Sequence, residues 1–354
     1  NMLCYGRDYT RSAHETRRLE VGSPTVEHNG DSLLGWPEYQ AGRVALVFST
    51  LYAPPQRFVT HPSEKYFYRD HDYETAHRIY WRELELYHRL ADEHPDKFSL
   101  VASRADLKRV LDHWHSPAPD SSDGHPVGLV FLMEGADGIR SPKELPRWYD
   151  MGLRHIGLAW AGTRYSGGTK EPGPLTDEGR ALLKAMADLN FTLDLSHMDE
   201  PAALEALDSY PGPIVVTHAN CLALLPGYET NRQLSDRVIR GLIERGGVMG
   251  VVPFNNFLKV GWLRTGGSQR EEVSLSAVAD HIDHICQLAG DTSHAAIGTD
   301  FDGGFGLQSV PPEIDTIVDL RKLGDLLQPR GFSDTDLAAI FGENWLRHLN
   351  QNLP

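Results

Sequence analysis

Short strand-like apolar runs alternate along this chain with longer segments in which apolar positions have helical spacing. A stretch near the middle shows this most clearly. Residues 192–195 and 214–216 are short apolar runs, and the alanine- and leucine-rich stretch 200–207 lies between them. Two prolines and a glycine at 210–213 end the helical pattern. This order predicts a strand, a helix and a second strand parallel to the first.

A histidine follows each strand of this predicted unit, at His197 and His218. Because parallel neighbouring strands end at the same edge of a sheet, both imidazoles are expected at the edge where α/β proteins gather their catalytic groups. Neutral imidazole is also the commonest protein ligand for zinc-like metals. One such histidine could equally bond the backbone, but a pair in equivalent positions favours a metal site.

The same patterns extend over most of the chain and predict a repeated order of strand and helix. Further strands are expected at 25–29, 43–51, 98–102, 127–133, 153–160, 248–254 and 295–298, and helices at 72–93, 105–114, 176–189, 235–245, 275–288, 313–328 and 333–349. Thr176 is the expected N-cap of its helix, and proline-rich turns are expected at 52–62 and 116–125.

Counting these units gives about eight, each of about 34 residues, which is ordinary for a (β/α)8 TIM barrel. We therefore predict one α/β barrel domain over residues 25–354, preceded by an irregular amino-terminal arm at 1–24. Polar residues at the strand ends would then share the carboxyl-terminal rim of the barrel.

Charge and cysteine content narrow the possible partners and compartment. The net charge of −15 argues against nucleic acid or an anionic membrane as partner, since both need a basic face. Cys4, Cys221 and Cys286 are odd in number and widely spaced, so they suggest a reducing compartment rather than a disulfide framework. Residues 1–20 hold no apolar signal-like core, and no apolar run approaches the ~18 residues of a membrane span. A cytoplasmic location is expected.

Six polar residues stand at predicted strand ends and form a mixed set of imidazoles and carboxylates: His28, Asp31, Glu134, His197, His218 and Asp300. Such a set, with one shared carboxylate, suits a two-metal hydrolytic centre in which a bridging water becomes hydroxide near neutral pH. Asp300 would then act as the proton shuttle to the leaving amine. Any of the carboxylates alone could be a helix cap or a loop salt bridge, but six such residues at one rim favour a functional site.

These residues lie in segments that resemble the renal (membrane) dipeptidase family, a branch of the amidohydrolase-like metal-dependent barrels. The matching segments cover roughly residues 25–349 and are EHNGDSLL (27–34), FLMEGADGI (131–139), MGLRHIGLAW (151–160), DLSH (194–197), VTHAN (216–220), NRQLSD (231–236), RGGVMGV (245–251), IGTDFDG (297–303) and GENWLRHL (342–349). Each segment alone is weak, but their order and spacing together are specific.

The resemblance implies a metallo-dipeptidase with two zinc ions, acting on a small dipeptide, and a homodimer. The implied ligands are His28, Asp31 and Glu134 for the first zinc and Glu134, His197 and His218 for the second. Arg232 would bind the substrate carboxylate, for which a guanidinium fork is well suited. Asp300 matches the family's acidic residue that contacts the substrate amine and moves protons. Asp302 fits by composition, but Asp300 is nearer the strand.

Two positions depart from the family pattern. The first motif is usually His-x-Asp, whereas this chain has one residue more between His28 and Asp31. A β-bulge at Gly30 could restore Asp31 to the metal, and without it the site is mononuclear. Trp160 stands where many relatives carry a substrate-contacting histidine, and tryptophan cannot take up a proton. The glycine-rich loop 161–173 that follows is expected to shape the substrate pocket.

The sequence therefore predicts a zinc-dependent dipeptidase in which Trp160, Arg232 and Asp300 contact substrate. The change at Trp160 leaves open a related amide or lactone hydrolase with a different substrate. The irregular first motif leaves open a barrel that has lost catalysis and serves as a binding protein.

Overall fold

The computed structural model describes residues 2–59, 66–116 and 124–354, and its core is a row of parallel strands. The main sheet has the order β1-β3-β4-β7-β8, and β2 pairs with the first half of β3. A parallel pair, β9 and β10, continues the row through a bridge between Val216 and Met249. These strands are β1 (Leu46–Tyr52), β2 (Phe98–Leu100), β3 (Val127–Glu134), β4 (Leu153–Gly157), β7 (Thr192–Asp194), β8 (Ile214–Val215), β9 (Met249–Val251) and β10 (Ala295–Ile297).

The fold is thus a mixed α/β fold with a parallel sheet. Among the residues that the structure describes, no strand pairing joins β10 to β1. Closure into the (β/α)8 barrel stays a prediction.

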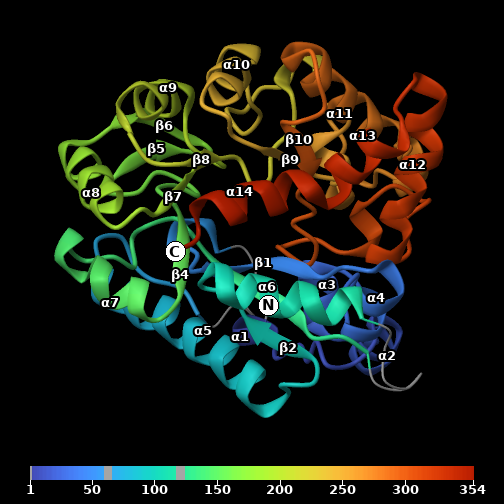
Figure 1. Ribbon diagram of the computed structural model, residues 1–354, viewed down its shortest axis with the longest axis horizontal. Coiled ribbons are helices and arrows are strands. Elements are labelled where there is room, and N and C mark those ends of the chain that lie inside the picture. Colours follow the sequence, from blue (N-terminus) through green and yellow to red (C-terminus); the bar gives the residue numbers. More distant parts are fainter. Residues whose placement is uncertain (1, 60–65, 117–123) are drawn as a thin grey trace.

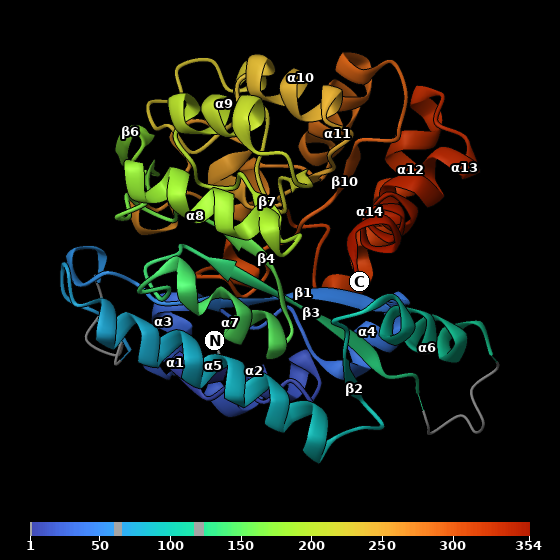
Figure 2. The same cartoon turned by 60° about the vertical axis from the view of Figure 1, so that its left-hand side comes forward.

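Helices cover the sheet as the strand–helix alternation predicts. They include α5 (Tyr73–Glu93), α6 (Arg104–His115), α7 (Leu145–Asp150), α8 (Asp177–Asp188), α9 (Glu200–Ser209), α10 (Asp236–Glu244), α11 (Ser276–Ala289), α12 (Lys322–Leu327), α13 (Asp334–Ala338) and α14 (Asn344–Asn352). The predicted N-cap Thr176 is confirmed, because its side chain accepts a hydrogen bond from Gly179 N. The chain through α7 forms one half of the molecule and α8–α13 the other, with α14 between them (Figures 1 and 2).

The register of the parallel strands determines which residues lie at the edge of the sheet where the site is found. Glu134 pairs with Gly157, Gly157 with Asp194, and Asp194 with Val215. These four residues therefore form one row across β3, β4, β7 and β8. His197 and His218 each follow this row by three residues, so they leave the sheet at the same edge as Glu134.

The amino-terminal region differs from the prediction. The predicted irregular arm contains α1 (Met2–Tyr5) and α2 (Ala13–Glu20), and the predicted strand at 25–29 is the helix α3 (Pro24–Asn29). Ser23 caps α3 by accepting a hydrogen bond from Val26 N, and Pro24 occupies its first turn. These two signals outweigh the β-branched pair that suggested a strand. Gly30, at φ 83°, ends the helix, so the expected β-bulge is absent there. A fourth helix, α4 (Trp36–Gly42), precedes β1.

Asp302 holds this amino-terminal region against the loop after β10. Its carboxylate lies 3.2 Å from Arg7 Nη1 and accepts hydrogen bonds from Tyr9 Oη at 3.2 Å and Ser32 Oγ at 2.7 Å. Arg7 also pairs with Glu20 at 2.9 Å. Both Arg7 and Asp302 are buried. The arm is therefore held on the rest of the domain by one buried charge pair, Arg7 with Asp302, and by the hydrogen bond from Tyr9.

Other predictions agree in position and differ in extent. The predicted loop 161–173 contains most of a short antiparallel hairpin, β5 (Ser166–Gly168) and β6 (Glu171–Leu175). Parts of the proline-rich turns predicted at 52–62 and 116–125 fall on 60–62 and 117–123, outside the described residues. Within the described ranges, no helix combines the length and apolar character needed to cross a membrane.

Candidate metal centre

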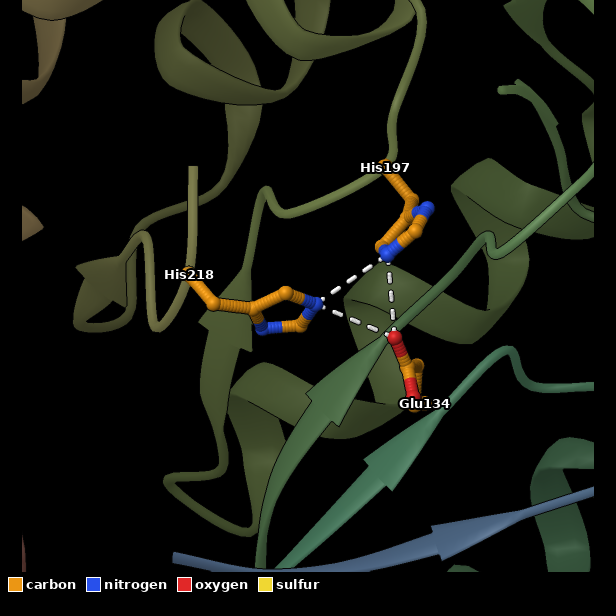
Figure 3. Close-up of side chains that lie close together, drawn as sticks. All are labelled: Glu134, His197 and His218. Carbon is orange, nitrogen blue, oxygen red and sulfur yellow. Dashed lines mark hydrogen bonds and ion pairs between the residues drawn. The ribbon is translucent and has the colours of Figure 1, made fainter. Parts of the chain in front are cut away.

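Three predicted ligands meet at the carboxyl-terminal edge of the sheet. Glu134 ends β3, while His197 and His218 lie in the loops after β7 and β8. Glu134 Oε1 is 3.0 Å from His197 Nε2 and 3.1 Å from His218 Nε2, and the two Nε2 atoms are 3.1 Å apart. Both imidazoles are buried and point toward the carboxylate (Figure 3). Two imidazole nitrogens and one carboxylate oxygen converging in this way form a donor set suited to a zinc-like metal.

Hydroxyl groups hold the outer nitrogens of both histidines. Thr217 Oγ1 donates to Asp194 Oδ2, so its lone pair can accept the Nδ1 proton of His218 at 2.9 Å. This leaves Nε2 of His218 facing Glu134. Thr169 Oγ1, in the β5–β6 hairpin, lies 2.9 Å from His197 Nδ1. Outer contacts of this kind orient metal-binding histidines. The sequence prediction did not include these threonines or Asp194, although DLSH and VTHAN contain two of the three.

The charges within the cluster favour a bound cation. Burial alone would raise the pKa of Glu134, but its hydrogen bonds with His197 and His218 lower it well below its usual range. Burial, with the nearby Arg232 cation, lowers the pKa of His197 to about 3, which keeps this imidazole neutral. Burial also acts to lower the pKa of His218, but Glu134 and Asp300 outweigh it and raise this pKa. An ionised carboxylate beside a neutral imidazole is a suitable pair of ligands for a metal ion.

Asp300 lines the same cavity as this cluster, and its backbone φ is 51°. His197 also has a positive φ, of 68°. Non-glycine residues in this region are uncommon and are concentrated at functional sites. Burial, with the negative charge of Glu134, raises the pKa of Asp300 to about 7. The carboxylate of Asp302, the alternative proton carrier, is already bonded to residues of the amino-terminal region. Asp300 is therefore the better candidate for moving protons.

Arg232 is a buried cation with unused donors. It is 2 % exposed, and its Nη2 donates to the backbone oxygen of His218 at 2.8 Å. Its Nε and Nη1 have no hydrogen-bond partner among the described residues. The guanidinium also lies 4.9 Å from the centre of the Phe257 ring. Burial lowers the pKa of Arg232, against the raising effect of Asp300 and Glu134. A buried cation with unpaired donors is well suited to an anionic ligand.

The structure does not bring His28 and Asp31 into the same group. His28 is in the last turn of α3, with its ring 6.0 Å from that of Tyr5. Asp31 Oδ2 accepts a hydrogen bond from Gln308 Nε2 at 2.7 Å. In the described part of the chain, Glu134, His197 and His218 form the group whose ligand atoms all lie within 4.8 Å of one another. His28 and Asp31 lie on a helix end and the loop after it in place of the predicted strand, and a second metal held by them stays a prediction.

A cavity of about 1090 Å³ joins these groups. It is lined by His28, the three cluster residues, Arg232, Asp300 and Trp160. Trp160 lies with its ring 6.1 Å from that of His197. The predicted substrate-contacting residues are therefore within one cavity.

Comparison with known proteins decides the family. The profile of the membrane dipeptidase family matches residues 26–352 of this chain. The chain belongs to the membrane dipeptidase family, peptidase family M19. The resemblance derived from the motifs is thereby confirmed.

Individual relatives agree with this membership. An uncharacterized protein in the pqqA 5' region of Klebsiella pneumoniae is 30% identical, with 77% of this chain and 95% of that protein covered. Dipeptidase tcpJ of Claviceps purpurea is 24% identical, with 88% of this chain and 67% of that protein covered. A similar fold is found in a Rhodobacter sphaeroides metallo peptidase, liganded with a phosphinate mimic of L-Ala-D-Ala, at a TM-score of 0.73 and 23% identity over 96% of both chains. The probable dipeptidase PvdM from Pseudomonas aeruginosa aligns with a TM-score of 0.75 and 18% identity over 96% of this chain and 97% of that one.

Proposed function

We propose that this member of the metallo-dipeptidase family is a zinc enzyme that hydrolyses small dipeptides with free amino and carboxyl ends. One observation supports this substrate above all. Arg232 is buried beside the cluster, and two of its three guanidinium nitrogens have no partner among the described residues. An anion supplied by the substrate would satisfy donors of this guanidinium. A dipeptide carries such an anion, its terminal carboxylate, about one residue from its amide bond.

Each residue of the centre has a role in this proposal. Glu134, His197 and His218 would hold one zinc. A bound zinc supplies Lewis acidity and lowers the pKa of water toward neutrality. Arg232 binds and orients the substrate carboxylate. Asp300 accepts the proton of the attacking water and passes it to the leaving amine, for which a pKa of about 7 is well suited.

The proposal differs from the two-zinc expectation in its metal count. One metal is proposed because Glu134, His197 and His218 form the metal-ligand cluster of the described residues, and Asp31 accepts a hydrogen bond from Gln308 outside it. The homodimer and the cytoplasmic location stay predictions.

Elemental analysis and a substrate survey together test the proposal. Protein purified without chelator should carry about one zinc per chain and hydrolyse free dipeptides much faster than their carboxyl-terminal amides. The survey should include N-acyl amino acids and lactones. About two zinc per chain would mean that His28 and Asp31 complete a second site. Hydrolysis of lactones or N-acyl amino acids in place of dipeptides would refute the proposed substrate. Absence of activity after zinc addition would refute the proposal that the protein is an enzyme.

A further inference from the structure

Three aromatic side chains from a strand end, a short helix and a loop form one wall of the cavity. Tyr52 ends β1, Phe58 lies in the short helix η1 (Gln56–Phe58), and Trp160 follows β4. The Trp160 ring is 5.3 Å from that of Tyr52 and 5.5 Å from that of Phe58, both in edge-to-face arrangements. All three residues are half-buried and line the cavity. We name these three residues the aromatic wall.

A single arginine fastens the loops that carry this wall. Arg57 Nε donates to Glu171 Oε1 at 2.7 Å, Nη2 donates to the backbone oxygen of Gly162 at 2.8 Å, and Nη1 donates to Asp70 Oδ1 at 2.6 Å. Its guanidinium also lies 5.5 Å from the centre of the Phe58 ring. The loop with Phe58 is thereby tied to the loop after Trp160 and to the β5–β6 hairpin. The wall is held in place before any ligand arrives, which lowers the entropy lost on binding.

Trp160 of the aromatic wall and Arg232 approach the cluster through different contacts. Trp160 lies beside His197, with ring centres 6.1 Å apart, whereas Arg232 bonds the backbone of His218. A dipeptide spans about 7 Å along its backbone. With its carboxylate on Arg232 and its amide at the cluster, the proposal places its first residue toward Trp160, and the reversed pair of substrates below tests this direction. The side chain of that residue is then the part of the substrate that meets the wall.

We propose that the aromatic wall selects dipeptides whose amino-terminal residue has a large apolar or aromatic side chain. The proposal rests on the proposed function, because it takes Arg232 as the carboxylate site and the cluster as the place of cleavage. The physical basis is removal of apolar surface from water against ring faces and edges that are already ordered. The cavity has room for such a group, since about 300–1,000 Å³ accommodates drug-sized ligands.

Steady-state kinetics on matched dipeptides test this selection. The substrates are Phe-Ala with Gly-Ala and, as the reversed pair, Ala-Phe with Ala-Gly. For the zinc-loaded wild type, kcat/KM for Phe-Ala should exceed that for Gly-Ala by about tenfold or more. Phe58→Ala should lower this ratio by about tenfold while changing the ratio of the reversed pair less than about twofold. The control Leu19→Ala removes an exposed apolar side chain of α2 that does not line the cavity, and it should leave both ratios unchanged.

A binding measurement separates this proposal from the proposed function. Reduced-amide analogues of Phe-Ala and Gly-Ala cannot be hydrolysed, and calorimetry on the zinc-loaded protein gives their affinities. If the Phe-Ala analogue binds more tightly than the Gly-Ala analogue and Phe58→Ala removes this difference, selection by the aromatic wall is supported even if no dipeptide is hydrolysed. If dipeptides are hydrolysed but both analogues bind equally well, selection by the aromatic wall is refuted and the proposed dipeptidase function stands. Phe58→Ala with an unchanged Phe-Ala to Gly-Ala ratio also refutes this selection.

Discussion

Replacing Arg232 by methionine should remove substrate binding without unfolding the protein. Methionine retains much of the length of the arginine stem and removes the guanidinium. In the wild type, Nε and Nη1 have no hydrogen-bond partner among the described residues, so a substrate carboxylate can accept two bonds, one from Nη2 and one from either of these nitrogens. Hydrogen bonds to charged groups contribute about 1.5–3 kcal/mol each, so two of them amount to about 3–6 kcal/mol. That free energy corresponds to a fall in kcat/KM of about 10²- to 10⁴-fold.

The assay compares a free dipeptide with its carboxyl-terminal amide, following release of the first amino acid. The free dipeptide should lose the full factor in Arg232→Met, while the amide should change less than about threefold, because it offers no carboxylate to bind. Equal losses for both substrates would refute carboxylate recognition by Arg232 and would point to a general disturbance of the site. A loss of less than about tenfold for the free dipeptide would refute it too.

The same variant tests whether the buried charge of Arg232 lowers the free energy of unfolding. Among the described residues, Arg232 has no ion-pair partner, and burial lowers its pKa. Removing a poorly compensated buried charge should therefore leave the free energy of unfolding unchanged or higher. Thermal unfolding of the zinc-loaded protein measures this. A marked destabilisation would mean that Arg232 is mainly a structural residue.

Three further predictions concern the neighbours of the site. Thr217→Val removes the hydroxyl that links His218 to Asp194, so the zinc affinity should fall about 10–100-fold. Competition with a chromophoric chelator measures this affinity, and the control Thr335→Val, on an exposed helix, should not change it. Asp300→Asn should lower kcat by about 10²–10⁴ at unchanged zinc content, and a kcat within threefold of wild type would exclude Asp300 as the proton carrier. Burial raises the pKa of Glu83 to about 8, so the native state keeps a proton that the unfolded state releases above its ordinary value of 4.5. The free energy of unfolding should thus fall as pH rises from 4.5 to 8, by at most about 5 kcal/mol, and Glu83→Gln should flatten this decline in denaturant titrations at pH 5 and 8; an unchanged slope would contradict it.

The strands and helices near the site could be predicted because their signals are local. Buried parallel strands such as β3 carry continuous apolar runs, and the loops after β7 and β8 begin at short polar motifs. The histidine pair and Glu134 followed from these positions, since parallel strands share an edge. The segment at 25–29 was predicted wrongly. There the β-branched residues suggested a strand, while Ser23 and Pro24 just before them set a helix start, so local signals conflicted and the capping signals prevailed.

The amino-acid sequence by itself determined the family, the alternation of strand and helix, and the three residues of the metal-ligand cluster. Only the tertiary structure decided that Asp31 bonds Gln308, that Thr169 reaches His197, and that Phe58 packs against Trp160. Each of these pairs joins loops that are distant along the chain. The physical reason is that periodicity and capping depend on neighbouring residues, whereas contacts between loops depend on how the whole sheet brings its edge together.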